Sequence, residues 1–271
     1  MIEDWDDAYT NGAYIEGAEE YPARWERLAA DFRQEMSGKQ RAELDVVYGN
    51  SERQLLDVFY PESDSRGLVV FVHGGYWRAF DKNSWSHLAT AAVSEGWTVV
   101  LPSYDLVPGV SISEITRQIA TAVTRAGSMV EGPIRLTGHS AGGHLVTRMI
   151  CRDTPLLPDI RQRIERVVSI SGLHDLRPLL KTKMNDDFRL LEEEAIAESP
   201  ALNQPVESIE LVCWVGADER PEFIRQADLL ANIWSGLGIK TSAHHAAGQN
   251  HFNVIEGLAE PGSDLIKVLL D

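Results

Sequence analysis

The chain has 271 residues and a formal net charge of −16 at pH 7, and 44% of its residues are hydrophobic. This length and apolar content suit one large α/β domain or two small ones with a buried core. The negative charge disfavours nucleic acid and anionic lipid surfaces as main partners, because both are themselves negatively charged.

The N-terminal segment, residues 1–37, is predicted to be helical after Pro22, because its aromatic and aliphatic side chains then recur at helical spacing. Two stretches of alternating apolar residues follow, AELDVVYG and RQLLDVFYP, and the turn-like sequence GNSE separates them. This pattern predicts an antiparallel hairpin at one edge of a sheet.

Short runs rich in β-branched residues then alternate with helix-length segments such as 84–95 and 111–126. The alternation predicts an α/β fold, with a mostly parallel sheet and helices on both of its faces. We find no repeat, low-complexity tract or linker, and therefore expect a single domain over residues 1–271. Residues 173–199 are polar and interrupt the alternation. They are predicted to be an insertion over one end of the sheet and a candidate lid over the active site.

The stretch RLTGHSAGGHLV places Ser140 between a predicted strand and a predicted helix. Reactive groups in an open parallel sheet gather at this end of the strands. Gly138 and Gly142 flank the serine as in a nucleophile elbow, where the turn is so sharp that bulky neighbours would collide. The pattern predicts a nucleophilic serine, although the motif alone also suits a plain glycine-rich turn.

A serine nucleophile requires a base that takes its proton and a carboxylate that orients the base. In this type of site the order along the chain is serine, acid, histidine. Asp218 ends the strand-like run ELVCWVGAD, and His251 follows the last predicted strand. We therefore predict Ser140, Asp218 and His251 as the catalytic triad, with Asp175, one strand earlier, as the alternative acid.

The stretch VVFVHGGYWRAF follows the first central strand and is predicted to supply an oxyanion hole. Acyl transfer builds negative charge on a carbonyl oxygen, which backbone N–H groups can stabilise. The expected donors are the N–H groups of Gly75 and Tyr76, together with that of Ala141 at a helix start. His73 is expected to hold this loop by hydrogen bonds. Taken alone, the two glycines also suit a tight turn at the end of a strand, without a role in catalysis.

These motifs resemble those of the α/β-hydrolase superfamily, in its esterase-lipase group, and within that group the kynurenine formamidases, also called arylformamidases. The resemblance rests on HGGYW at 73–77, GHSAGGHL at 138–145, SGLHDLRPL at 171–179, ESPA at 198–201 and NHFNVIEGL at 250–258. It implies the α/β-hydrolase fold and the triad above. The implied reaction is hydrolysis of N-formylkynurenine to kynurenine and formate, without a cofactor.

The motif HGGYW also occurs in related carboxylesterases and thioesterases, so these activities remain alternatives with the same triad. The chain departs from the family at Asp105, where arginine is usual. Trp77, Phe188 and Phe252 are candidate residues of an aromatic substrate pocket. A third hypothesis is a catalytically inactive binding protein on a hydrolase scaffold.

The histidines show no convincing metal-ligand spacing, and we expect neither a metal nor another cofactor. Cys151 and Cys213 lie in apolar contexts and are predicted to be buried free thiols, which fits a reducing cytoplasm. The acidic N-terminus is unlike a signal peptide, and no apolar run approaches membrane-span length. The expected partner is a small-molecule substrate rather than nucleic acid or a membrane. A homodimer is left open.

Overall fold

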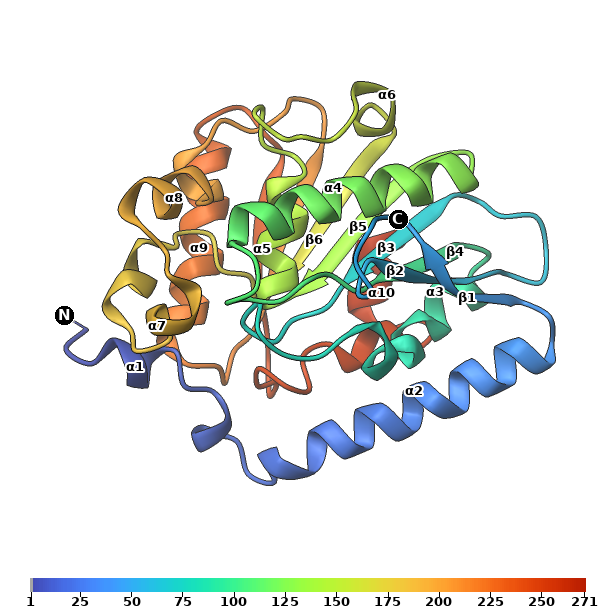
Figure 1. Cartoon of the computed structure of the whole chain (residues 1–271), viewed down its shortest axis with the longest axis horizontal. Coiled ribbons are helices and arrows are strands. Elements are labelled where there is room, and N and C mark those ends of the chain that lie inside the picture. The colour runs from blue at the N-terminus through green and yellow to red at the C-terminus, as the bar shows by residue number, and fades with distance from the viewer. Residues whose placement is uncertain (1) are drawn as a thin grey trace.

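The computed structural model describes residues 2–271, which form an α/β-hydrolase fold around one central sheet (Figure 1). The strand order within these residues is β1-β2-β4-β3-β5-β6-β7-β8. The strands are β1 (Ala42–Val47), β2 (Leu55–Phe59), β3 (Leu68–Val72), β4 (Thr98–Pro102), β5 (Ile134–His139), β6 (Ile164–Ile170), β7 (Glu210–Gly216) and β8 (Thr241–Ala246).

Strand β2 pairs antiparallel with both β1 and β4, and the pairs from β4 through β3 to β8 are parallel. The predicted N-terminal hairpin and mostly parallel sheet are therefore confirmed. The carboxyl ends of β3, β5, β6 and β7 meet at one edge of the sheet, where loops from distant parts of the chain can combine into a site.

Helices cover both faces of the sheet, as predicted (Figure 1). One face packs against α4 (Ile112–Met129), α5 (Ala141–Arg148) and α9 (Pro221–Ser235), and the other against α2 (Tyr21–Gly38), α3 (Thr90–Ser94) and α10 (Asp264–Leu270). Successive side chains of a strand point to opposite faces. The core on the α4 and α5 side, here called the first core, therefore contains Leu68, Val70 and Val72 of β3. The second core, on the α2 side, contains Val69 and Phe71.

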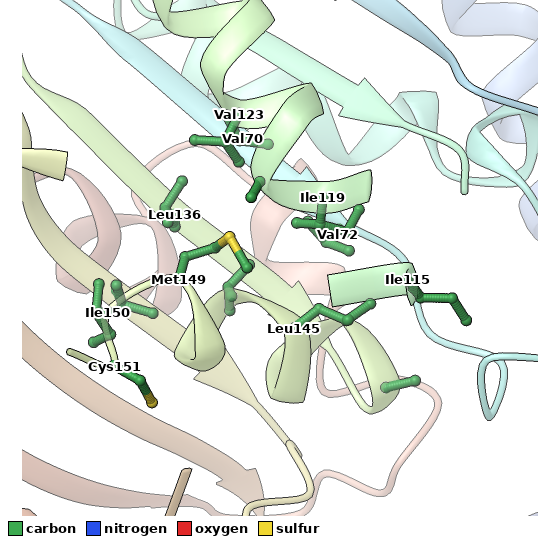
Figure 2. Close-up of a cluster of buried hydrophobic side chains, with 14 of the residues drawn as sticks. Val70, Val72, Ile115, Ile119, Val123, Leu136, Leu145, Met149, Ile150 and Cys151 are labelled. Atoms are coloured by element: carbon green, nitrogen blue, oxygen red, sulfur yellow. The ribbon is translucent and has the colours of Figure 1, made fainter. Parts of the chain in front are cut away.

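The first core lies between the central strands and α4 and α5. Figure 2 shows its side chains interdigitating across this layer: Val70, Val72, Leu136, Ile115, Ile119, Val123, Leu145, Met149, Ile150 and Cys151. A close-packed core of this kind fixes the start of α5, and with it the turn that enters the helix. Cys151 and Cys213 are buried free thiols, as predicted.

The remaining helices are short. They are α1 (Trp5–Ala8), α6 (Pro158–Arg161), α7 (Asn185–Phe188), α8 (Glu192–Ala197), and the 3-10 turns η1 (Gly12–Tyr14), η2 (Ala18–Glu20), η3 (Lys82–Ser84), η4 (Ser86–Ala89), η5 (Arg177–Lys181), η6 (Pro200–Leu202) and η7 (Glu256–Ala259). The helix expected over 84–95 is broken, because Trp85 leaves the helical region with φ −127° and packs its ring 4.7 Å from that of Trp25. None of the described helices combines the length and apolar character needed to cross a membrane.

Candidate active site

Ser140 lies at the tight turn between β5 and α5, and its backbone has φ 54° and ψ −114°. A side chain rarely adopts this conformation, and here the flanking glycines permit it. A Cβ atom on Gly142 would lie 1.9 Å from the carbonyl oxygen of Val72, and one on Gly138 would lie 2.4 Å from that of Gly142. Both glycines are therefore required by close backbone approach, and the turn has the geometry expected of a nucleophile elbow.

His251 lies in the loop after β8 and is buried. Its Nδ1 atom is 2.6 Å from Oε2 of Glu219, whose side chain is also buried. The other carboxylate oxygen of Glu219 accepts hydrogen bonds from Ser171 Oγ at 2.5 Å and from the Gly216 N–H at 2.8 Å. A carboxylate held in this way can fix the imidazole ring with a proton on Nδ1, which leaves Nε2 as the basic nitrogen.

The carboxylate beside His251 is thus Glu219, and the prediction of Asp218 for this position is wrong. Asp218 is exposed, and its N–H donates to the carbonyl of Gln249 in the turn after β7. The next residue, Glu219, points back into the protein. Asp175, the alternative acid, instead accepts hydrogen bonds from the Arg177 guanidinium at 2.9 Å.

The loop HGGYW lies directly against the serine turn. A Cβ atom on Gly74 would be 3.1 Å from Cβ of Ser140, and Gly75 and Tyr76 both have positive φ angles, 110° and 51°. Among the described residues, the N–H groups of Gly75 and Tyr76 make no hydrogen bond. The N–H of Ala141, the first residue of α5, cannot find a partner within the helix. These three groups can therefore receive an anion.

Two histidines hold the backbone around the site. His73 is buried, with Nδ1 2.7 Å from the Gly74 carbonyl oxygen and its ring stacked 4.2 Å from that of Tyr104. His139 Nε2 is 2.9 Å from the carbonyl oxygen of His251. Burial, helped by the nearby His251 ring, holds the pKa of His139 well below its ordinary value. His139 is therefore a neutral ring that supports the His251 backbone.

Ser140 and His251 line one cavity of about 420 Å³. Most of its wall is apolar and aromatic, which suits a ligand with an apolar ring. The other lining residues are Gly12, Ala18, Glu19, Pro22, Trp25, Gly75, Tyr76, Arg78, Ala79, Phe80, Trp85, His139 and Phe252.

Of the three predicted pocket residues, Phe252 lines the cavity, whereas Trp77 and Phe188 do not. Trp77, the last residue of the loop, has φ 55° and is fully buried, and its ring meets that of Phe188 edge-on at 5.7 Å and that of His144 at 5.2 Å. None of residues 173–199 is among the lining residues either. The wall that sequence reasoning missed comes from the N-terminal segment and from the stretch that contains Phe80 and Trp85.

Comparisons with known proteins agree with this fold. A sequence profile of the BD-FAE family matches residues 56–229. Kynurenine formamidase of Danio rerio is 31% identical over 273 residues, which cover 92% of each chain. The crystal structure of a provisionally assigned thioesterase from Silicibacter sp. TM1040 is 51% identical, with a TM-score of 0.94 and 99% of each chain covered. Esterase B from Lactobacillus rhamnosis shares the fold at 17% identity, with a TM-score of 0.66 over 86% of this chain and 90% of its own.

Proposed function

The chain belongs to the BD-FAE family, and from this premise we propose that it is a serine hydrolase that works through an acyl-enzyme. One observation carries the proposal: a single cavity is lined by Ser140 with its strained turn, by His251 with its buried partner Glu219, and by Gly75 and Tyr76, whose N–H groups make no hydrogen bond among the described residues. Each has a distinct role, as nucleophile, as base with its orienting acid, and as oxyanion hole.

In the proposed reaction, Nε2 of His251 takes the hydroxyl proton of Ser140 while Oγ bonds to the substrate carbonyl carbon. The negative charge on the carbonyl oxygen is held by the N–H groups of Gly75, Tyr76 and Ala141. His251 then gives its proton to the leaving group as the bond to the carbonyl carbon breaks. Water, deprotonated by the same imidazole, attacks the acyl-enzyme, and the acid departs as Ser140 regains its proton.

The substrate that we propose first is an aryl formamide, with N-formylkynurenine hydrolysed to kynurenine and formate. Two observations support it: the likeness to the Danio rerio kynurenine formamidase extends over nearly the whole of both chains, and the cavity is lined by the rings of Trp25, Phe80, Trp85 and Phe252. An aromatic amine as the leaving group would fit such a wall.

A thioesterase or carboxylesterase with the same machinery is the second candidate. The 51% identity to the provisionally assigned thioesterase supports it. Measuring kcat/KM for N-formylkynurenine, short p-nitrophenyl esters and acyl thioesters side by side tests the choice. We expect the formamide to have the highest kcat/KM. A preference for thioesters or simple esters of about tenfold or more would favour the second candidate.

A fluorophosphonate probe tests the serine mechanism independently of the substrate. We expect labelling of the wild-type chain and none of Ser140→Ala, with kcat of the variant lower by about 10⁶. Ser128→Ala, which removes a hydroxyl that bonds the Arg125 carbonyl on α4, is the matched control and should label normally. Absence of labelling in the wild-type chain, or equal labelling of Ser140→Ala, would indicate a binding protein on a hydrolase scaffold.

A further inference from the structure

The N-terminal residues 5–20, here called the strap, form one wall of the cavity that contains Ser140. Gly12, Ala18 and Glu19 line the cavity together with Ser140 and His251. In Figure 1 the strap is the blue segment that runs from α1 to the start of α2. The substrate site is therefore assembled from the two ends of the chain as well as from the centre of the sheet.

The strap is tied by the side chain of Tyr76 to the HGGYW loop, residues 73–77, here called the oxyanion loop. Its hydroxyl donates to the Tyr9 carbonyl oxygen at 2.5 Å and accepts a hydrogen bond from Asn11 Nδ2 at 3.1 Å. Burial raises the pKa of Tyr76 to about 12, so the hydroxyl keeps its proton at neutral pH. Tyr76 lines the cavity together with Ser140, and its N–H makes no hydrogen bond among the described residues, so one residue joins the proposed oxyanion hole to the strap.

A second set of contacts holds the strap near Glu219, the carboxylate that pairs with His251. Arg220 follows Glu219 directly, and its guanidinium lies 3.7 Å from the centre of the Tyr14 ring and donates to the Asp7 carboxylate. The buried Tyr9 hydroxyl donates to Glu222 Oε1 at 2.8 Å. The strap is therefore held both at Tyr76 and next to Glu219, which fixes its position relative to these residues.

The wall of the cavity has space at Gly12. A Cβ atom at this position would lie 3.8 Å from Cβ of Ala18 and 3.9 Å from Cζ of Phe252, both of which are cavity residues. These are ordinary contact distances, so a small side chain fits without a clash. Because Gly12 lines the cavity, we expect a larger side chain there to reduce the space for a ligand.

We propose that the strap determines which substrates the cavity accepts: Gly12 leaves room for an apolar, ring-sized group, and the Tyr76 hydroxyl fixes the strap against the oxyanion loop. This inference rests on the hydrolase function proposed above. The ring class follows from the aromatic wall of the cavity: Phe252 lies next to Gly12, and its ring centre is 5.5 Å from that of Trp25, which also lines the cavity.

The test compares three esters that differ in the presence and place of a ring: vinyl acetate without a ring, phenyl acetate with a ring on the leaving group, and vinyl benzoate with a ring on the acyl group. For Gly12→Leu we expect kcat/KM of at least one ring ester to fall about tenfold or more relative to vinyl acetate. The affected ester also identifies which part of the substrate faces the strap. Gly12→Ala should show a smaller change in the same direction.

Ala13→Leu is the matched control, because it places the same side chain one residue later, at an exposed position outside the cavity. Its ester ratios should equal those of the wild-type chain, and thermal melting establishes that each variant is folded. If vinyl acetate is hydrolysed and Ser140 is labelled, but Gly12→Leu and Gly12→Ala leave both ester ratios unchanged, the strap proposal alone is overturned. If no ester is hydrolysed and Ser140 is not labelled, the proposed function is overturned together with it.

The hydrogen bonds between the Tyr76 hydroxyl and the strap are tested with Tyr76→Phe, which removes the hydroxyl and keeps the ring and the backbone. We expect KM for the affected ring ester to rise several-fold more than KM for vinyl acetate, because the strap loses its fixed position. Tyr60→Phe is the control: it removes a hydroxyl that bonds Glu43 near the far edge of the sheet. Equal KM changes for the ring ester and vinyl acetate in Tyr76→Phe would overturn the proposal that the Tyr76 hydroxyl fixes the strap.

Discussion

Glu219 and His251 form a buried pair, with 2.6 Å between the carboxylate Oε2 and the ring Nδ1. The carboxylate has no freedom to turn, because Ser171 and the Gly216 N–H occupy its other oxygen. The adjacent carboxylate, Asp218, is exposed to solvent. Two neighbouring acids of the same charge therefore have very different environments, and their substitution should have very different effects on activity.

Replacing Glu219 by glutamine should lower kcat by about 10³–10⁴, because the amide no longer stabilises the imidazolium that forms during the reaction. Asp218→Asn removes the same charge one residue earlier and should leave kcat close to the wild-type value. Steady-state kinetics on any ester that the wild-type chain hydrolyses measures both. A larger loss in Asp218→Asn than in Glu219→Gln would restore the original assignment.

The choice between these acids shows where sequence reasoning ends. The strand, the turn after it and the order serine, acid, histidine all follow from the pattern along the chain. Which of two consecutive side chains points inward depends on the turn itself, in which Asp218 N–H bonds the Gln249 carbonyl and Glu219 N–H bonds that of Gly216. If the turn began one residue earlier or later, the other acid would point inward. Nothing in the local sequence ADER, residues 217–220, determines where the turn begins.

The serine turn was more predictable than the cavity. Gly138 and Gly142 are required by backbone contacts that any chain making this turn would have. The local sequence motif therefore suffices to predict the turn. The cavity wall depends on packing between segments far apart in sequence. Trp25 packs against Phe252, more than two hundred residues away in sequence, whereas Trp77, the last residue of the oxyanion loop, is buried in the core. Aromatic character alone cannot separate these two outcomes.

Ser171→Ala should reduce kcat without affecting substrate binding. The Ser171 hydroxyl donates to Glu219 at 2.5 Å, and a hydrogen bond to a charged group contributes about 1.5–3 kcal/mol, which corresponds to roughly tenfold or more in rate if it is lost in the transition state. Ser169→Ala is the control, because this buried hydroxyl lies in β6, two residues before Ser171, and contacts His174 instead of Glu219. A larger change in KM than in kcat for Ser171→Ala would contradict the positioning role.

Gly142→Ala should destabilise the fold and remove activity. The added Cβ would lie 1.9 Å from the Val72 carbonyl oxygen, which is central-strand backbone and cannot move aside, so we expect a loss of about 1–3 kcal/mol or more. Gly38→Ala at the end of α2 meets no atom within 4 Å and should change stability by about 1 kcal/mol at most. Urea unfolding measures both. Equal unfolding midpoints for the two variants would show that the turn can relax.

The buried histidines predict how stability depends on pH. Burial lowers the pKa of His73 to about 4 and those of His144 and His174 to about 3. In the unfolded chain these rings have the ordinary pKa of about 6.5, so below that pH the unfolded state binds more protons than the folded state. The stabilisation they give is complete above pH 6.5 and declines as the pH falls toward 4 and 3.

We therefore expect the free energy of unfolding, measured by urea denaturation, to be nearly constant just above pH 6.5 and to fall below it. Each of these histidines contributes a limiting slope of about 1.4 kcal/mol per pH unit once its unfolded form is protonated. The Asp175 carboxyl adds to the loss at lower pH: burial raises its pKa, but hydrogen bonds from Arg177 outweigh this and lower it overall. The unfolding free energy should thus decrease more steeply between pH 5.5 and 4.5 than between pH 7.5 and 6.5. A flat profile from pH 7.5 to 4.5 would mean that the buried rings accept protons in the folded state.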